Sequence, residues 1–75
     1  MTANMKYVIC DNQNIAIFSD VNTHADIAKG MYGKVTGAGF IFFKDNKPIC
    51  HGQSVSLKVK SNEEFDSYII QKSLN

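Results

Sequence analysis

The pattern of hydrophobic and polar residues predicts a short β-hairpin near the start of the chain. Two apolar runs, Lys6–Cys10 (KYVIC) and Ile15–Phe18 (IAIF), are rich in the β-branched and aromatic residues that favour strands. Between them, residues 11–14 (DNQN) favour a turn because their side chains bond to nearby backbone. Both strands are largely apolar on both faces, which favours a covered place in a sheet over an exposed edge.

A second, longer hairpin is predicted from Lys34 to Val59. Its first strand, at about Val35–Lys44, carries Gly37-Ala38-Gly39 directly before the aromatic run FIFF. A glycine inside a strand offers no packing and usually marks a bulge or a close approach by another element or a ligand. We therefore expect a bulge, a tight helix contact or a ligand near these glycines.

The turn of this second hairpin is predicted at Asp45–Pro48, and its length decides which side chains share a face. An even-length loop places Phe40 and Phe42 on the side of Ile49 and His51, whereas a three-residue loop exchanges the partners. The sequence leaves both registers open. Stacking of nucleic acid bases on the aromatic residues is a further possibility, but the flanking basic residues are few and the core needs these side chains.

From Ile49 onward the residues alternate, which predicts one strand continuing to Lys60. One face of this strand is mostly apolar and comprises Ile49, His51, Gln53, Val55, Leu57 and Val59. The other face is small and then basic, and comprises Cys50, Gly52, Ser54, Ser56, Lys58 and Lys60.

Two helices are predicted from their capping signals. Thr23 followed by Asp26 resembles a capping box and predicts a helix from about His24 to Lys29 or Met31, which a left-handed glycine, Gly30 or Gly33, would end. We expect the His24 side chain in this helix to face solvent. The segment Ser61–Glu64 predicts a second helix with Ser61 as its cap. Its predicted buried face comprises Phe65, Tyr68 and Ile69 with the stem of Lys72, widened by Ile70 and Leu74.

These elements, taken in order, predict an α+β fold of the type ββαββα. We expect two layers, a four-stranded and mostly antiparallel sheet with both helices on one face. The 75 residues form one small domain, residues 1–75, in which residues 1–4 are predicted to be disordered. So small a domain exposes apolar surface, and we therefore expect a homodimer or a higher oligomer.

Composition narrows the classes of partner. The net charge of +1, with lysine as the only basic residue besides histidine, argues against nucleic acid and anionic membranes. Neither a signal peptide nor a long apolar run is present, so we expect a cytoplasmic protein with no membrane partner.

Sequence motifs for catalysis, metals or cofactors are lacking. Cys50 and His51 are adjacent, but neighbours on a strand point to opposite faces and cannot share a proton directly. Two histidines and two cysteines without ligand spacing do not predict a metal site, and we expect no cofactor. An enzyme that uses the thiol or the imidazole remains an alternative, although we expect a protein that is not an enzyme.

The small and basic face of the predicted long strand is the candidate binding surface. Its residues are Gly52, Ser54, Ser56, Lys58 and Lys60. Small side chains permit close approach by a partner, while hydroxyl and ammonium groups suit an anionic ligand. The structural alternative is a sheet edge protected by lysine.

The last half of the chain, GAGFIFF followed by ICHGQSVSLKVKSNEEFDSYII, resembles small uncharacterised proteins of bacteriophages and prophages. This resemblance implies an origin in a mobile genetic element, where small proteins commonly bind and block host machinery. It implies no catalytic activity.

Three functional hypotheses follow from these observations. The first is a non-enzymatic protein-interaction module, an inhibitor or adaptor of phage type that acts on a bacterial host protein. The second is a protein that binds a small anionic metabolite or nucleotide through Ser54, Ser56, Lys58 and backbone N–H groups near Gly37 and Gly39. The third is a structural homo-oligomer.

Overall fold

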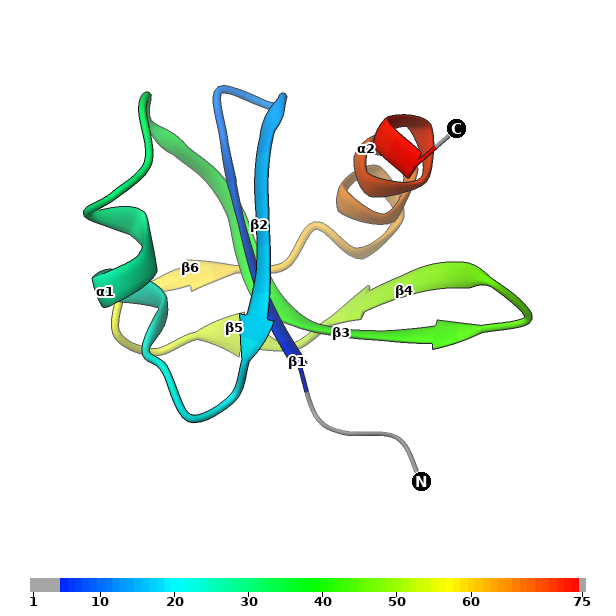
Figure 1. The fold of residues 1–75 in the computed structure, drawn as a ribbon, viewed down its shortest axis with the longest axis horizontal. Coiled ribbons are helices and arrows are strands. Elements are labelled where there is room, and N and C mark those ends of the chain that lie inside the picture. The colour runs from blue at the N-terminus through cyan, green and yellow to red at the C-terminus, as the bar shows by residue number, and fades with distance from the viewer. Residues whose placement is uncertain (1–4, 75) are drawn as a thin grey trace.

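The computed structural model describes residues 5–74, and the sequence prediction for residues 1–4 lies outside them. A four-stranded antiparallel sheet contains β1 (Met5–Cys10), β2 (Asn14–Ser19), β3 (Val35–Lys44) and β4 (Lys47–His51), in the spatial order β2-β1-β3-β4. The remaining elements are α1 (His24–Ala28), a small hairpin of β5 (Gln53–Ser54) and β6 (Val59–Lys60), and α2 (Glu63–Leu74) (Figure 1). The mixed α+β class and the four-stranded antiparallel sheet are confirmed.

Tight turns close both hairpins of the sheet. In the β3–β4 hairpin, Asp45 and Asn46 both have positive φ, as a two-residue type I′ turn requires, and Lys44 pairs with Lys47. The even-length register is therefore the correct one, and Phe40 lies opposite His51. In the β1–β2 hairpin, Asp11 and Asn12 adopt positive φ in the same way. Asp and Asn tolerate this conformation better than other residues with a side chain.

The two helices pack against opposite faces of the sheet. On one face, Tyr7 and Ile9 of β1 form a core cluster with Ile69 and Ile70 of α2. On the other, Val8 and Cys10 of β1 pack against Ala38 and, from the α1 side, Ala28 and Met31. Figure 1 shows α1 and α2 on either side of β1 and β2. The expected two-layer arrangement, with both helices on one face, is wrong in this detail, because apolar residues on both faces of β1 need cover on both sides.

The predicted strand from Ile49 to Lys60 is not continuous. It ends at His51 because Gly52 has φ of 75° and redirects the chain into β5. A turn at residues 55–58, with Lys58 also at positive φ, then returns the chain as β6. This correction changes which residues share a face.

Helix α1 begins as predicted. The Thr23 hydroxyl accepts a hydrogen bond from the Asp26 N–H at 3.1 Å, as an N-cap residue should. The helix ends at Ala28, and its C-cap Lys29 is right-handed, so a left-handed glycine does not end it. Gly33 does adopt positive φ, but it lies beyond the helix end.

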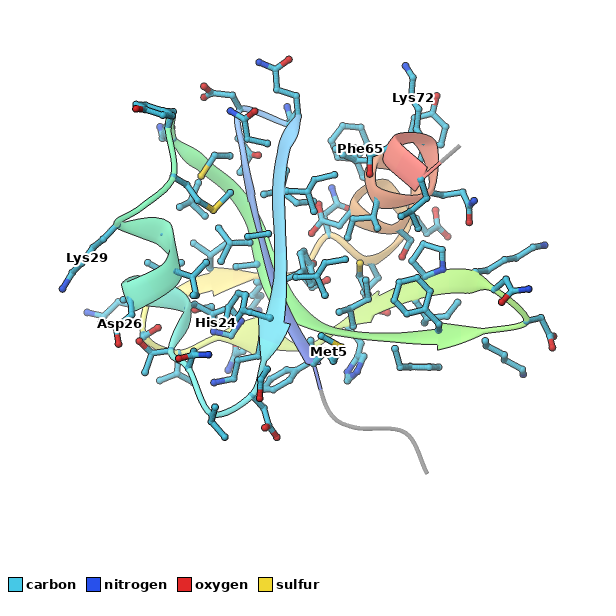
Figure 2. The ribbon with its side chains drawn as sticks, in the orientation of Figure 1. Met5, His24, Asp26, Lys29, Phe65 and Lys72 are labelled. Carbon is cyan, nitrogen blue, oxygen red and sulfur yellow. The ribbon has the colours of Figure 1, made fainter. Side chains whose placement is uncertain are left out.

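Helix α2 is present as predicted, but it faces the sheet differently. Its buried residues are Asp66, Ile69 and Ile70, whereas Phe65 and Tyr68 are largely exposed. Figure 2 shows Phe65 on the side of the helix toward β2, where it borders an open groove with Gln13 and Ile15, and Lys72 projecting from the helix. The Ser61 hydroxyl is bonded to the Tyr7 hydroxyl at 2.6 Å, and α2 begins after Asn62 instead. A buried carboxylate, absent from the predicted face, determines the rotation of the helix.

Candidate functional site

The five residues of the predicted binding surface do not lie along one strand face, although Ser54, Lys58 and Lys60 line one open hollow of about 360 Å³. Gly52 lies at the break between β4 and β5, Ser54 is buried, and Lys58 occupies the turn between β5 and β6. Ser56 and Lys60 are exposed, one in the turn and the other in β6. The continuous strand that would have aligned them is missing.

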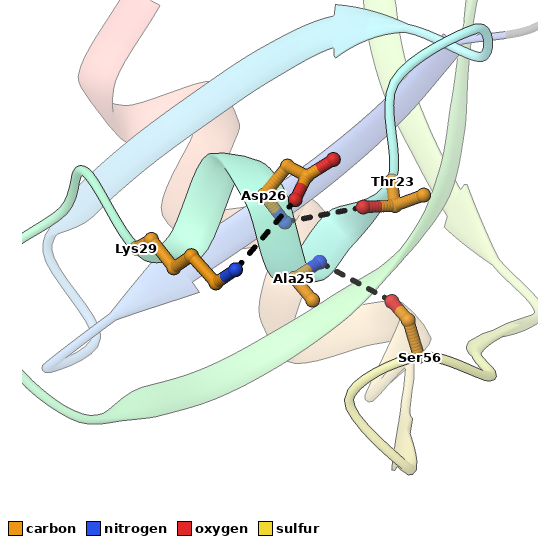
Figure 3. Close-up of polar contacts among 5 residues, drawn as sticks. All are labelled: Thr23, Ala25, Asp26, Lys29 and Ser56. Atoms are coloured by element: carbon orange, nitrogen blue, oxygen red, sulfur yellow. Dashed lines mark hydrogen bonds and ion pairs between the residues drawn. The ribbon is translucent and has the colours of Figure 1, made fainter.

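Both serine hydroxyls are used to build the fold. The Ser54 Oγ accepts a hydrogen bond from the Leu57 N–H at 3.2 Å, which closes the turn between β5 and β6. The Ser56 Oγ accepts one from the Ala25 N–H at 3.2 Å and thereby caps the first turn of α1 (Figure 3). These two contacts attach the β5–β6 hairpin to itself and to α1, so the oxygen of each hydroxyl has a structural role in the fold.

The glycines of β3 make room for α2 and for the backbone of the neighbouring strand β4. A Cβ on Gly37 would lie 2.6–2.8 Å from the Asp66 carboxylate, and a Cβ on Gly39 would lie 2.7 Å from the His51 carbonyl oxygen. The tight helix contact is therefore the correct alternative at Gly37. The ligand-binding hypothesis placed its backbone N–H groups here, at positions that are buried.

A buried network joins the first strand to the last helix. The Tyr7 hydroxyl donates to Asp66 Oδ2 at 2.5 Å, and the Asn62 N–H donates to the same oxygen at 3.1 Å. Burial raises the pKa of the Asp66 carboxyl, and these two hydrogen bonds oppose that rise. Burial, with the bond to Asp66, also raises the pKa of the Tyr7 phenol. Because Tyr7 and Asp66 are 0% and 1% exposed, the network stabilises the fold and offers no surface to a substrate.

The reactive side chains are separated. Cys50 is buried in the core with Tyr7, where burial raises the pKa of its thiol, and His51 lies on the opposite face, stacked on Phe40 at 5.9 Å. Cys10 is buried as well, and burial raises its pKa. A raised pKa keeps a thiol protonated and poorly nucleophilic. Within residues 5–74, no group of three or more His, Cys, Asp or Glu side chains is arranged to hold a metal ion.

His24 is buried, not solvent-facing as predicted. It is 3% exposed, its Nε2 lies 2.8 Å from the Gly39 carbonyl oxygen, and its ring meets Phe18 and Phe40 edge-on. Figure 2 shows it directed from α1 toward the strands. The histidine is thus a packing residue whose polar atom has a backbone partner.

An exposed aromatic surface lies on the β3–β4 hairpin. We name the aromatic patch as Phe40, Phe42, Ile49 and His51, which the observed register places on one face. The His51 ring lies 5.9 Å from Phe40 and 5.5 Å from Phe42, and Phe42 pairs with Ile49 across the strands. Phe42 and Ile49 are 40% and 37% exposed. Helix α1 reaches only the Phe40 end of the patch, through the ring of His24 at 6.0 Å, and Phe42 and Ile49 stay exposed beyond it.

Positive charge surrounds the aromatic patch. Lys44 and Lys47 form the last pair of the hairpin, and the alternation of the strands places both on the face of Phe42. At the other end, the Lys6 ammonium lies 6.0 Å from the centroid of the Phe40 ring. Beside it an open groove of about 320 Å³ continues the surface along Phe40 and Val55. The patch and its three lysines can bind an apolar surface bordered by acidic groups.

Sequence reasoning had considered these aromatic residues only as core or as a stacking surface. The useful signal was the Asp45-Asn46 pair, which tolerates the two positive φ angles of a type I′ turn and would have set the register.

Scans against protein-family models, curated proteins and solved structures gave no match. Over the described residues, no helix combines the length and the apolar character needed to cross a membrane.

Proposed function

We propose that the protein is a non-enzymatic protein-interaction module that binds its partner through the aromatic patch. The observation that carries this proposal is the exposure of Phe42 and Ile49 within a contiguous group of four aromatic or aliphatic side chains. Exposed apolar groups that gather on one face, bordered by polar residues, are typical of interaction sites.

The partner surface is expected to be apolar at its centre and acidic at its border. Lys6, Lys44 and Lys47 would meet the acidic groups, which steer the encounter, while Phe42 and Ile49 would enter the apolar centre. A protein fits better than a nucleic acid, because Ile49 offers no stacking surface to bases and the net charge is only +1. In biological terms we propose an inhibitor or adaptor of phage type that acts on a bacterial host protein, and this part rests on the sequence resemblance.

Photo-cross-linking in the cells that naturally make the protein tests this proposal. Phe42 is replaced by the photo-reactive amino acid p-benzoylphenylalanine. The matched control carries the same replacement at Tyr32, another exposed aromatic residue, which lies beside Asn14 at the far end of β2. We expect one predominant protein adduct from position 42 that the control lacks. We also expect the adduct to disappear when Ile49→Ser and Lys44→Glu are added.

Three outcomes would overturn the proposal. The first is the absence of any adduct beyond those of the control. The second is an adduct that nuclease digestion removes, which would assign the patch to nucleic acid. The third is an adduct whose mass is that of two copies of this chain, which would make the patch a self-association surface.

A further inference from the structure

The two edges of the main sheet are protected to different degrees. At the β4 edge, Pro48 has no N–H to offer, Lys47 places a charge on the strand, and the Cys50 N–H donates to Ser67 Oγ of α2 at 3.0 Å. Proline, lysine and a covering helix are devices by which proteins prevent another strand from pairing with an edge. A second chain cannot extend the sheet readily at β4.

The opposite edge, β2, has none of these devices. Its six residues, NIAIFS, contain neither proline nor a charged side chain, and it pairs with β1 without a bulge. In the part of the chain that the structure describes, β2 is the last strand of the sheet, and neither helix crosses it (Figure 1). Its four apolar residues, Ile15 to Phe18, are all half-buried. An uncharged, regular and apolar edge strand readily pairs with another strand.

The register of the sheet shows which backbone groups point outward from β2. In the two-residue β3–β4 hairpin, Lys44 and Lys47 form the first hydrogen-bonded pair, so alternate residues of β3 face β4 and the others face β1. The same alternation continues through β1 into β2. The backbone N–H and C=O groups of Ala16 and Phe18 therefore point toward β1. Those of the alternate residues point toward the free edge, and these residues are Ile15, Ile17 and Ser19. Ile15 and Ile17 thus present unpaired backbone groups at the edge, whereas the Ser19 carbonyl oxygen already accepts a hydrogen bond from the Asn22 N–H at 3.2 Å.

We propose that β2 pairs antiparallel with β2 of a second copy of the chain, which joins the two sheets into one of eight strands. With Ile17 opposite Ile17 of the second copy, the free backbone groups of Ile15 and Ile17 and the N–H of Ser19 all face the partner strand. The same register places Ala16 opposite Phe18, so a small side chain meets a large one. It also places Asn14 opposite Asp20, so polar residues border the apolar contact at both ends.

Self-pairing fits β2 better than pairing with an unrelated strand. A strand without charge can meet its own copy with no repulsion between like charges directly opposite one another. The interface is also symmetric, so one strand supplies both of its halves. It lies at the end of the sheet opposite β4, and therefore leaves the aromatic patch of each copy open for a partner. The proposal is independent of the proposed function.

Sedimentation equilibrium over a concentration series tests the proposal, with Ala16→Lys as the disrupting variant. Ala16 belongs to neither core cluster, so the new ammonium group falls on the proposed interface without removing core contacts. We expect the wild-type mass to rise from 8.4 kDa toward twice that value. Ala16→Lys should weaken the association by about tenfold or more, whereas the control Val55→Lys, at an exposed position of the separate β5–β6 hairpin, should associate like the wild type.

Amide hydrogen exchange gives a second measurement that does not depend on a variant. The N–H groups of Ile15 and Ile17 should be protected in the dimer and should exchange rapidly in dilute, monomeric protein. A wild-type protein that stays at 8.4 kDa overturns the proposal, and so does an Ala16→Lys variant that is folded by circular dichroism and associates like the control. Protection of these amides at the mass of one chain also overturns it, because another extended segment would then occupy the edge.

Discussion

Replacing Gly37 with alanine should destabilise the protein through a contact with one identified group. The new Cβ would lie 2.6–2.8 Å from three atoms of the Asp66 carboxyl group, which must then move by several tenths of an ångström. That carboxylate is held by Tyr7 and by the Asn62 N–H, so its movement weakens buried hydrogen bonds. Overpacking costs about 1–3 kcal/mol, and a hydrogen bond to a charged group contributes about 1.5–3 kcal/mol. We expect a loss of about 3 kcal/mol.

A loss of this size is a large part of the total stability, which is about 4–11 kcal/mol for a domain of 75 residues. Urea unfolding followed by circular dichroism should show a lower midpoint with an unchanged slope. Gly30→Ala is the matched control, because its Cβ would meet only the Ile27 carbonyl oxygen at an ordinary 3.7 Å. Its effect should stay within about 0.5 kcal/mol.

A double-mutant cycle with Asp66→Ala tests the physical cause. Without the carboxylate the contact disappears, and Ser61 remains as a hydrogen-bond partner of the Tyr7 hydroxyl. In that background Gly37→Ala should cost less than about 1 kcal/mol, which gives a coupling energy of about 2 kcal/mol. Equal costs of Gly37→Ala in both backgrounds would refute the reasoning.

Two further predictions concern the titration of Asp66 and the packing of His24. Burial raises the pKa of Asp66 in the folded state. Between the unfolded and the folded pKa, the folded state therefore holds a proton that the unfolded state has released. The free energy of unfolding should fall as the pH rises through this range. Subtracting urea midpoints of Asp66→Asn from those of the wild type, from about pH 3 to about pH 7, isolates this effect, and a difference that rises with pH would contradict it. His24→Ala should cost about 2–4 kcal/mol in thermal unfolding, because it leaves a cavity between two phenyl rings and removes a buried hydrogen bond to the Gly39 carbonyl oxygen. The control on the same helix is Asp26→Ala, which removes only an exposed ion pair with Lys29 and should change the stability by less than about 0.5 kcal/mol. Equal losses of stability in the His24 and Asp26 variants would show that His24 lies in an exposed site.

Local signals in the sequence were sufficient for the elements whose causes are local. The strands of both hairpins of the main sheet and the Thr23 cap could be predicted because turn chemistry and capping act over a few residues. The predicted long strand failed where the backbone changes direction. Gly52 adopts positive φ inside a sequence that still alternates, and alternation alone cannot distinguish a straight strand from a folded one.

The candidate site was harder to predict because its residues are placed by long-range contacts. The predicted buried face of the last helix left out Asp66, and His24 was expected to face solvent. Each is buried against a partner on a distant segment, Tyr7 for Asp66 and Gly39 for His24. Burial of Asp66 turns Phe65 and Tyr68 of α2 outward. In the same way, Ser54 and Ser56 could be recognised as structural only once the turn between β5 and β6 was known.

The hydrogen bond between Tyr7 and Asp66 spans 59 residues of the sequence, and this separation affects synthesis as well as stability. While the ribosome still holds α2, β1 can pair with β2 and β3, but the Tyr7 hydroxyl has no carboxylate to bind and one face of the sheet stays uncovered. The nascent chain therefore exposes apolar strand surface until α2 emerges. Chaperones or proteases that recognise such surface would act during this interval, and truncation within α2 would prolong it indefinitely.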